Sequence, residues 1–365
     1  MSAAPLEVRH ALGSYPVYVE PGLVGRLGAL AARHLPGRRL ALITDTGVAP
    51  RFREWRSGAA DALELAAELV VPAGEGSKTR ATWARLSDAL LERGFGRDSA
   101  VIAVGGGMVG DLAGFVAATY LRGIPYLQVP TTLLAMLDAS VGGKTAVDTP
   151  HGKNLIGAFH PPVAVAADPR APLTLPDREF RSGLAEAVKH GLVASREYFA
   201  WLAGSADAIL ARDEATLAEL VRESVRIKAA VVAEDEREAG RRAILNAGHT
   251  VGHALEHASR YGLAHGEAVA LGLVAECRLA EALGLAREGV AREVARLLER
   301  FGLPTRLPAP LPREEVLAAM AHDKKRRAAG LRLALPTGLG AMAPGEGWTV
   351  AASEADLVRA LDSLG

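Results

Sequence analysis

The sequence predicts an α/β domain with a parallel sheet followed by a mostly α-helical domain, and three observations predict this fold class. Short β-rich runs alternate with helical patterns through about residue 170, a glycine-rich turn joins one run to a helix, and long helical patterns then continue to about residue 299. Alternating strands and helices form a parallel sheet with crossover helices. We therefore divide the 365 residues into domains 1–170 and 171–365 and expect them to pack around a cleft.

The elements of the first half follow from local patterns. Apolar runs predict strands at residues 40–44, 68–71, 100–104 and 125–129. Residues 78–93 form an amphipathic helical pattern, with a predicted core face of Trp83, Leu86, Leu90 and Leu91. Turn and helix-start signals at residues 174–180 open the helical half, and the next strand-like run is residues 331–335.

The composition excludes several classes of protein. With 49% hydrophobic and 23% charged residues, the chain is neither disordered nor collagen-like. Its formal net charge is zero, so we expect no nucleic-acid partner. The single cysteine, Cys277, lies in an apolar helical pattern and is expected in the core. The N-terminus has no secretory pattern, and the longest apolar window, residues 100–121, is interrupted by glycines and Asp111. We expect a cytoplasmic protein without a membrane role.

Two glycine-containing turns favour nucleotide binding. Gly105, Gly107 and Gly110 stand in G-x-G-x-x-G register between a predicted strand and a helix, where backbone amides can approach phosphate. The acidic ribose ligand expected about 20 residues later is missing, so the turn departs from the ordinary dinucleotide motif. An earlier turn offers Glu75 for a ribose hydroxyl and Lys78 for charge. A merely structural strand-to-helix turn is the alternative.

Lysine is rare in this chain, because 35 of the 42 basic residues are arginine. Where arginine is the default cation, a retained lysine marks a position that needs a compact, flexible ammonium group. The lysines are Lys78, Lys144, Lys153, Lys189, Lys228, Lys324 and Lys325.

Polar groups of many kinds gather in residues 129–162. The segment offers hydroxyls at Thr131 and Thr132, a carboxylate at Asp138, ammonium groups at Lys144 and Lys153, and an amide at Asn154. A purely structural loop does not need this variety, so we predict a loop that lines a site.

Four of the ten histidines lie between residues 249 and 265. His249, His253 and His257 share one helical face, and His265 precedes a new helical pattern. Imidazoles from two helices suit a zinc-type metal, which often recruits a carboxylate as well. The H-E-x-x-H protease motif is absent. Spacing leaves open which two histidines bind and which carboxylate joins them.

Two further pairs are candidates for the same cleft. Glu186 and Lys189 lie one helical turn apart, as either a surface ion pair or two members of a site, and the residues alone favour the surface pair. Arg242 and Asn246 precede His249 at helical spacings.

The chain carries, in order, the motifs GEGSK, GGGMVGDLAGF, RGIPYLQVPTTLLAMLDASVGGKTAVD, GKNLIGAFHPP, SGLAEAVKHG, RAILNAGHTVGHALE, HGEAVALG and HDKK. In this order and spacing it resembles the 3-dehydroquinate synthase family of the shikimate pathway, nearly end to end. The resemblance implies an N-terminal NAD-binding α/β domain, a C-terminal helical domain that binds zinc or cobalt, and a homodimer. The implied substrate is 3-deoxy-D-arabino-heptulosonate 7-phosphate, and the implied products are 3-dehydroquinate and phosphate.

The resemblance also implies roles for individual residues. The metal ligands would be Glu186, His249 and His265. NAD would contact Asp45, Glu75, Lys78, Gly106, Gly107, Met108, Val109, Gly110, Asp111, Thr131, Thr132, Lys144, Lys153 and Thr174. The substrate would contact Asp138, Lys144, Asn154, Lys189, Lys228, Arg242, Asn246, His253 and a lysine of the HDKK motif, for which we favour Lys324 over Lys325. Arg122 resembles the family's arginine that reaches the partner subunit's phosphate site.

Three rival functions share parts of this pattern. Sister cyclases act on glucose 6-phosphate or sedoheptulose 7-phosphate, polyol dehydrogenases of similar design release NADH, and a non-catalytic homologue would have lost a ligand or a site lysine. Arg242, Asn246 and His253 together resemble the dehydroquinate synthase pattern, and no such loss is seen. His257 has no role that the resemblance supplies.

Overall fold

The computed structural model describes residues 4–59, 61–260, 262–324 and 331–365, with side chains described up to residue 320 and again from residue 331. The chain divides into two compact units. The sheet unit comprises Met1–Leu175 and Leu217–Ala229, and the helical unit comprises Pro176–Thr216 and Ala230–Gly365. The predicted fold class, a parallel-sheet α/β part followed by a helical part, is confirmed.

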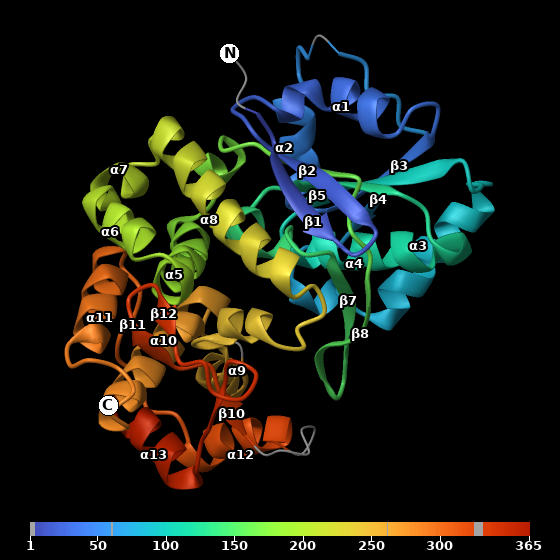
Figure 1. Cartoon of the computed structure of the whole chain (residues 1–365). Coiled ribbons are helices and arrows are strands. Elements are labelled where there is room, and N and C mark those ends of the chain that lie inside the picture. The colour runs from blue at the N-terminus through green and yellow to red at the C-terminus, as the bar shows by residue number, and fades with distance from the viewer. Residues whose placement is uncertain (1–3, 60, 261, 325–330) are drawn as a thin grey trace. The chain divides into compact units, whose positions relative to one another are not determined.

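The sheet unit is built on seven strands in the order β1-β2-β9-β6-β5-β3-β4 (Figure 1). All neighbours are parallel except β1 and β2, which pair antiparallel at one edge. The strands are β1 (Leu6–His10), β2 (Gly13–Val19), β3 (Arg39–Asp45), β4 (Ala67–Val71), β5 (Ser99–Gly105), β6 (Tyr126–Pro130) and β9 (Ala164–Ala167). The four predicted strands are present as β3, β4, β5 and β6.

Helices cover both faces of this sheet. Successive side chains of a strand point to opposite faces, so each strand contributes to two separate apolar groups. On β3, Leu40 and Leu42 pack with one group of apolar residues, and Ala41 and Ile43 pack with another. The first group includes residues of α1 (Leu27–His34) and α2 (Val48–Trp55), and the second includes residues of α3 (Arg80–Glu92) and α4 (Gly107–Thr119).

The core face predicted for α3 is mostly correct. Leu86 and Leu90 are buried, and Trp83 packs against the same core. The prediction is wrong for Leu91, which is 56% exposed. Successive helical residues point about 100° apart, so a helix that buries Leu90 turns its neighbour toward solvent.

Residues 129–162, predicted as a loop, contain regular structure, and this prediction is wrong. A π-helical turn, η4 (Ala135–Ala139), precedes the antiparallel strands β7 (Lys144–Thr149) and β8 (Gly152–Phe159). Strand β8 has no alternation of buried apolar and exposed polar residues that would predict a strand. Little of it is buried, and Leu155, Ile156 and Phe159 are exposed. Short 3-10 turns are η1 (Val24–Arg26), η2 (Glu75–Ser77), η3 (Tyr120–Arg122) and η5 (Ala171–Thr174).

The helical unit confirms the predicted run of long helices. It contains α5 (Asp177–Ala194), α6 (Arg196–Gly204), α7 (Ala206–Leu210), η6 (Arg241–Asn246), α9 (His249–Ala258), α10 (His265–Ala282), α11 (Val290–Arg300), α12 (Arg313–Lys324) and α13 (Glu354–Asp362). The middle of α8 (Glu214–Glu234) is counted with the sheet unit. Of the predicted strand at residues 331–335, only β10 (Arg332–Leu333) forms, paired with β13 (Val350–Ala351). A second small pair joins β11 (Pro336–Gly338) to β12 (Ala341–Met342).

Helix α10 is the centre of the helical unit and packs directly against α5, α9, α11 and α13. Two glycines allow the closest of these approaches. A Cβ at Gly266 would lie 2.0 Å from the carbonyl oxygen of Ser182 in α5, and one at Gly272 would lie 1.9 Å from that of Gly248, just before α9. The backbones of α5, α9 and α10 therefore meet without intervening side chains. Cys277, in the same helix, is buried as predicted.

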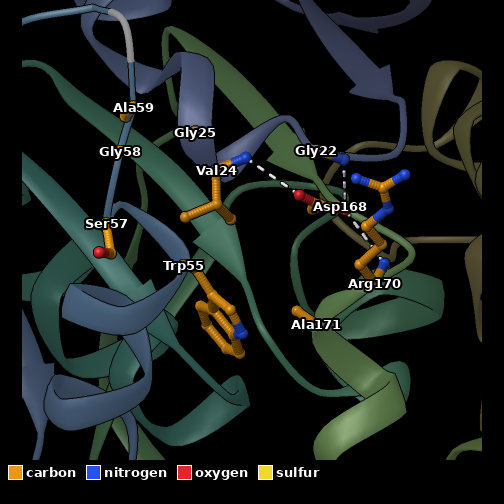
Figure 2. Close-up of a pocket in the computed structure, with 10 residues that line it drawn as sticks. All are labelled: Gly22, Val24, Gly25, Trp55, Ser57, Gly58, Ala59, Asp168, Arg170 and Ala171. Atoms are coloured by element: carbon orange, nitrogen blue, oxygen red, sulfur yellow. Dashed lines mark hydrogen bonds between the residues drawn. The ribbon is translucent and has the colours of Figure 1, made fainter.

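A pocket of about 360 Å³ in the sheet unit is lined in part by Trp55, Asp168 and Arg170 (Figure 2). The Asp168 carboxylate accepts hydrogen bonds from the backbone amides of Gly22 at 3.0 Å, Val24 at 3.1 Å and Arg170 at 3.0 Å. This acid therefore ties together the loops that follow β2 and β9. None of the helices in the described residues has the length and apolarity needed to cross a bilayer.

Candidate active site

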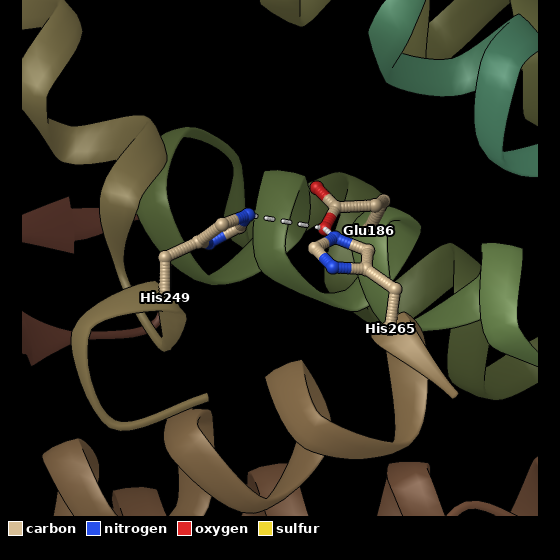
Figure 3. Close-up of side chains that lie close together, drawn as sticks. All are labelled: Glu186, His249 and His265. Carbon is tan, nitrogen blue, oxygen red and sulfur yellow. Dashed lines mark ion pairs between the residues drawn. The ribbon is translucent and has the colours of Figure 1, made fainter. Parts of the chain in front are cut away.

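Three helices of the helical unit bring a carboxylate and two imidazoles together (Figure 3). Glu186 lies in the middle of α5, while His249 and His265 are the first residues of α9 and α10. Nε2 of each histidine lies 3.6 Å from Oε1 of Glu186. One ligand atom from each residue falls within 4.8 Å of the others.

These donors fit the metal that the resemblance implies. Two imidazole nitrogens and a carboxylate oxygen form a ligand set typical of catalytic zinc, which keeps a fourth position open for substrate. The carboxylate is fully buried and the two rings are partly buried, so the group is largely screened from water.

Lys189 and Glu186 form an ion pair inside the helical unit. The side chains are only 2% and 0% exposed, so the surface-pair interpretation favoured by spacing alone is wrong. A buried carboxylate needs a nearby positive charge. Lys189 supplies one on the helix that also carries the candidate ligand.

The two histidines have opposite acid–base properties in the metal-free geometry. Burial, reinforced by the positive charge of Lys189, lowers the pKa of His249 to about 3. Burial also acts to lower the pKa of His265, but hydrogen bonds and charge attraction from Glu186 and Glu256 outweigh it and raise that pKa to about 9. His249 is therefore neutral and ready to act as a ligand, whereas His265 must release a proton first.

Glu256 is a site residue that the sequence reasoning missed. Its Oε2 lies 3.5 Å from Nδ1 of His265, on the opposite side of the ring from Glu186. Glu256 is only 6% exposed. A carboxylate behind a ligating histidine fixes the ring orientation. With His253 and His265 it also forms a second group of metal-capable atoms. The available signal was a glutamate about one helical turn after His253, within the same histidine-rich helical pattern.

Arg242 and Asn246 lie on the 3-10 turn η6 directly before α9. The buried Arg242 guanidinium donates to the carbonyl of Glu236, and the Asn246 amide donates to the Glu238 carboxylate. Asp235 organises this loop by accepting from the backbone amides of Ala239, Gly240 and Arg242.

The role of Asp235 was also missed from the sequence. Burial acts to raise its pKa, but the three backbone hydrogen bonds outweigh that effect and lower it. Asp side chains often accept hydrogen bonds from the backbone of the turn that follows them. An Asp directly before this turn was therefore the available signal.

In the sheet unit, the predicted glycine turn joins β5 to α4 at the carboxyl end of the strand. Cβ atoms at Gly106 and Gly107 would lie 3.1 Å from Cγ2 of Thr132 and 3.3 Å from Cβ of Ala139. Side chains there would fill the space above the start of α4, where backbone amides lack helical partners. The cradle therefore fits a pyrophosphate group.

The other residues of this turn have packing roles. Val109 is buried against Gly105, and a Cβ at Gly110 would lie 2.3 Å from the side chain of Gln128. The Met108 side chain packs against the core.

The sheet topology also favours a nucleotide site near this turn. The chain leaves β3 toward β4 on one side and returns to β5 on the other, so the strand order reverses between β3 and β5. Ligands of open parallel sheets bind at such a switch point, beyond the carboxyl ends of the strands. Asp45 ends β3, and its Oδ1 accepts from the amides of Gly47 at 2.8 Å and Val48 at 2.9 Å.

Lys78 is buried among three carboxylates. Its Nζ lies 2.9 Å from Glu75, 3.1 Å from Asp111 and 3.8 Å from Asp148. Burial acts to lower its pKa, but the attraction of Asp111 and Glu75 outweighs that effect and raises the pKa well above its usual range. Lys78 thus remains charged and joins η2, α4 and β7.

The remaining cofactor candidates lie at strand and turn ends. Thr131 follows β6, is buried, and donates its backbone amide to the carbonyl of Gly105 at 2.9 Å. Oγ1 of Thr132 accepts from the amide of Ala135 at 3.2 Å. Thr174 ends η5 and donates its hydroxyl to the carbonyl of Ala171 at 3.0 Å. Lys153 is the second residue of β8.

Asp138 and Lys228 form a direct pair within the sheet unit. Nζ of Lys228 lies 2.6 Å from both the carbonyl oxygen and the Oδ1 atom of Asp138. Asp138 belongs to the π-helical turn η4, a rare geometry that often occurs at functional sites. Lys144 begins β7 with its side chain exposed.

Two predicted residues have unusual backbone conformations. Asn154 has φ +56°, and its backbone N–H donates to Oδ1 of Asp148 at 2.8 Å. Arg122 has φ +70° and follows Leu121 at φ +50°, so two non-glycine residues in succession are left-handed. Such strain concentrates at functional sites.

Lys324 and Lys325 cannot be placed as site residues. Lys324 ends α12, its side chain falls outside the described residues, and Lys325 falls outside them altogether.

Comparison with known proteins identifies the family. Residues 68–182 match the family described as 3-dehydroquinate synthase N-terminal, and residues 183–326 match 3-dehydroquinate synthase C-terminal. A protein of Symbiobacterium thermophilum named 3-dehydroquinate synthase is 48% identical over 328 residues, which cover 88% of this chain and 91% of that protein. The chain belongs to the 3-dehydroquinate synthase family.

Solved structures of sister cyclases share the family's fold. A 2-deoxy-scyllo-inosose synthase complexed with carbaglucose-6-phosphate, NAD+ and Co2+ is 26% identical with a TM-score of 0.87, covering 98% of this chain and 99% of that one. A 2-epi-5-epi-valiolone synthase from Streptomyces hygroscopicus with NAD+ and Zn2+ bound is 29% identical with a TM-score of 0.83, covering 100% and 99%. The whole chain therefore follows the sugar phosphate cyclase architecture.

Proposed function

We propose that this protein is a 3-dehydroquinate synthase of the shikimate pathway, which converts 3-deoxy-D-arabino-heptulosonate 7-phosphate to 3-dehydroquinate and phosphate. Membership of the family supports the activity. The single structural observation that carries it is the convergence of Glu186, His249 and His265 beside the buried Lys189. Because the cofactor would be restored in each turnover, the net reaction would be that of a phosphate-eliminating lyase.

Two cofactors belong to this proposal. Glu186, His249 and His265 would hold zinc or cobalt, and the turn at Gly106 and Gly107 would hold the pyrophosphate of NAD. When bound, NAD supplies reversible hydride transfer and the divalent ion supplies Lewis acidity toward a substrate hydroxyl. The remaining NAD contacts are assigned to Asp45, Glu75, Lys78, Met108, Val109, Gly110, Asp111, Thr131, Thr132, Lys144, Lys153 and Thr174.

The substrate carries both a phosphate and a carboxylate, so a chain of zero net charge must bind it with local cations. We assign this task to three of the chain's few lysines and to one buried arginine. They are Lys144, Lys189, Lys228 and Arg242. Asp235 and the carbonyl of Glu236 hold Arg242 in place, and Glu186 pairs with Lys189. Asp138, Asn154, Asn246, His253 and Lys324 complete the assigned contacts.

We further propose a cytoplasmic homodimer. The exposed apolar side chains of Leu155, Ile156 and Phe159 on β8 support association with a second copy, because among the described strands β8 pairs only with β7 and it has a hydrophobic surface. Arg122 is assigned to the partner subunit's phosphate site, and its strained, exposed turn supports a functional role.

The substrate separates this proposal from the sister cyclases. Purified protein with NAD and zinc would be given 3-deoxy-D-arabino-heptulosonate 7-phosphate, glucose 6-phosphate or sedoheptulose 7-phosphate, with phosphate release and absorbance at 340 nm recorded. We expect phosphate from the first sugar alone and no accumulation of NADH. Release from another sugar would transfer the function to a sister cyclase, and NADH accumulation would indicate a dehydrogenase.

A further inference from the structure

A buried carboxylate outside the three candidate ligands is bonded to the start of the helix that carries one of them. Glu276 lies within α10 and is 1% exposed. Its Oε2 accepts from the backbone amide of Gly248 at 2.6 Å, and the amide of Val251 also faces the carboxylate. Gly248 is the N-cap of α9 and Val251 is the third residue of that helix, whose first residue is His249.

This helix cannot cap itself. The first amides of a helix lack helical acceptors, and an N-cap side chain usually satisfies one of them. Residue 248 has no side chain, and a Cβ there would lie 2.7 Å from Cγ of Leu273 at a φ of +77°. Glu276 instead satisfies the N-cap amide of α9 from the neighbouring helix α10, and this amide is one of the two that a capping box satisfies.

The cap acts at the residues that surround His249. Two contacts orient the ring of His249. Nδ1 lies 3.1 Å from the carbonyl oxygen of Ala247, and Nε2 faces Glu186. The backbone directly before His249 is held by Glu276, while Gly272 brings α10 against the carbonyl of Gly248. A shift of this first turn would therefore move the Nε2 atom relative to Glu186 and His265.

We infer that Glu276 is a positioning residue for the metal centre, which holds His249 in register with Glu186 and His265 by capping α9 from α10. This inference rests on the metal site of the proposed function. An apolar residue of similar size would fill the space but leave the buried amide of Gly248 without its acceptor, at a cost that loosens the first turn.

The same helix offers a matched control. Glu281 of α10 accepts from the backbone amide of Ala291 at 2.9 Å, and Ala291 is the second residue of α11. It thus performs the same type of cap on a helix to which no metal ligand is assigned. Substitution of either glutamate by leucine removes one interhelical cap.

The test compares zinc affinity in the full-length wild type, Glu276→Leu, Glu276→Gln and Glu281→Leu. Affinity is measured by competition with a chromophoric chelator, and hydrogen exchange of the Gly248 and Val251 amides is measured in the metal-free proteins. We expect zinc to bind about 10- to 100-fold more weakly in Glu276→Leu. Those two amides should also exchange faster. Glu276→Gln should keep the wild-type affinity, because its amide oxygen still accepts from Gly248, and Glu281→Leu should keep it as well.

Several results would overturn the inference. Unchanged zinc affinity in Glu276→Leu would limit this residue to a structural role, and an equal loss in Glu281→Leu would indicate general destabilisation. If Glu276→Leu does not fold, Glu276→Asp replaces it, since the shorter side chain withdraws the acceptor and should weaken zinc about tenfold. Unchanged affinity in that variant would also reject the inference. Failure of the proposed metal site is distinguishable, because zinc binding by the wild type would then be absent or would survive His249→Ala.

Discussion

Close packing of α5 against α10 should determine whether the metal centre forms, and Gly266→Ala tests this directly. Gly266 follows His265, and its amide donates to Oγ of Ser182 at 2.8 Å. The added Cβ would lie 2.0 Å from the Ser182 carbonyl oxygen, so the backbones would have to part by about 1.4 Å to reach the 3.4 Å at which ordinary contact begins. Ser182 is one helical turn before Glu186.

The expected consequences are a loss of stability and a loss of metal binding. Overpacking of this kind costs about 1–3 kcal/mol of unfolding free energy. Metal–ligand distances tolerate changes of only about 0.2 Å, so separating Glu186 from His265 should weaken zinc at least tenfold. Urea unfolding and chelator competition measure the two effects.

Gly204→Ala is the matched control, because Gly204 ends α6 and a Cβ there meets no atom within 4 Å. This substitution should leave zinc affinity unchanged and alter stability by no more than about 1 kcal/mol. The reasoning is refuted if Gly266→Ala binds zinc as tightly as the wild type while remaining equally stable.

Three further predictions follow from the buried charges. Lys189→Ala should lower kcat by about 100- to 1,000-fold while the circular dichroism spectrum is retained, and near-normal turnover would remove Lys189 from the site. Lys78→Met should lower the unfolding free energy by about 3–5 kcal/mol, because it strands the carboxylates of Glu75 and Asp111, and a change below about 1 kcal/mol in urea unfolding would contradict this. Burial raises the pKa of Glu276 to about 8 from a usual 4.5, so the folded state binds more protons than the unfolded state between these values. Wild-type stability should therefore fall as pH rises from 4.5 to 8, more steeply than that of Glu276→Gln, and equal slopes would disprove the shift.

The parts of the fold with strong local signals could be predicted from the sequence. Strands such as β5, whose residues are all buried, are recognisable as apolar runs. His249, His253 and His257 share one helix and His265 begins the next, as the spacing indicated. By contrast, β9 consists of AVAA, and alanine has little preference for strands. Strand β8 could not be predicted from the sequence, because its apolar residues are exposed and stand beside polar ones.

The environment of the candidate site was harder to predict, because burial depends on segments distant in sequence. Glu186 and Lys189 have the spacing of a surface pair, and packing of distant segments such as α10 against α5 places them in the interior. Glu276 stands in an otherwise apolar helical stretch, where a lone carboxylate signals a buried partner but not its identity. That partner, the Gly248 amide, is 28 residues away in sequence.

The requirement for a metal held by Glu186, His249 and His265 is tested most directly by zinc titration of the metal-stripped protein. Phosphate release from 3-deoxy-D-arabino-heptulosonate 7-phosphate would be followed with NAD present while zinc is added in steps. We predict that the rate rises to a plateau at one zinc per chain and stays near zero for His249→Ala. Full phosphate release without metal, or an unchanged titration curve for His249→Ala, would contradict the account.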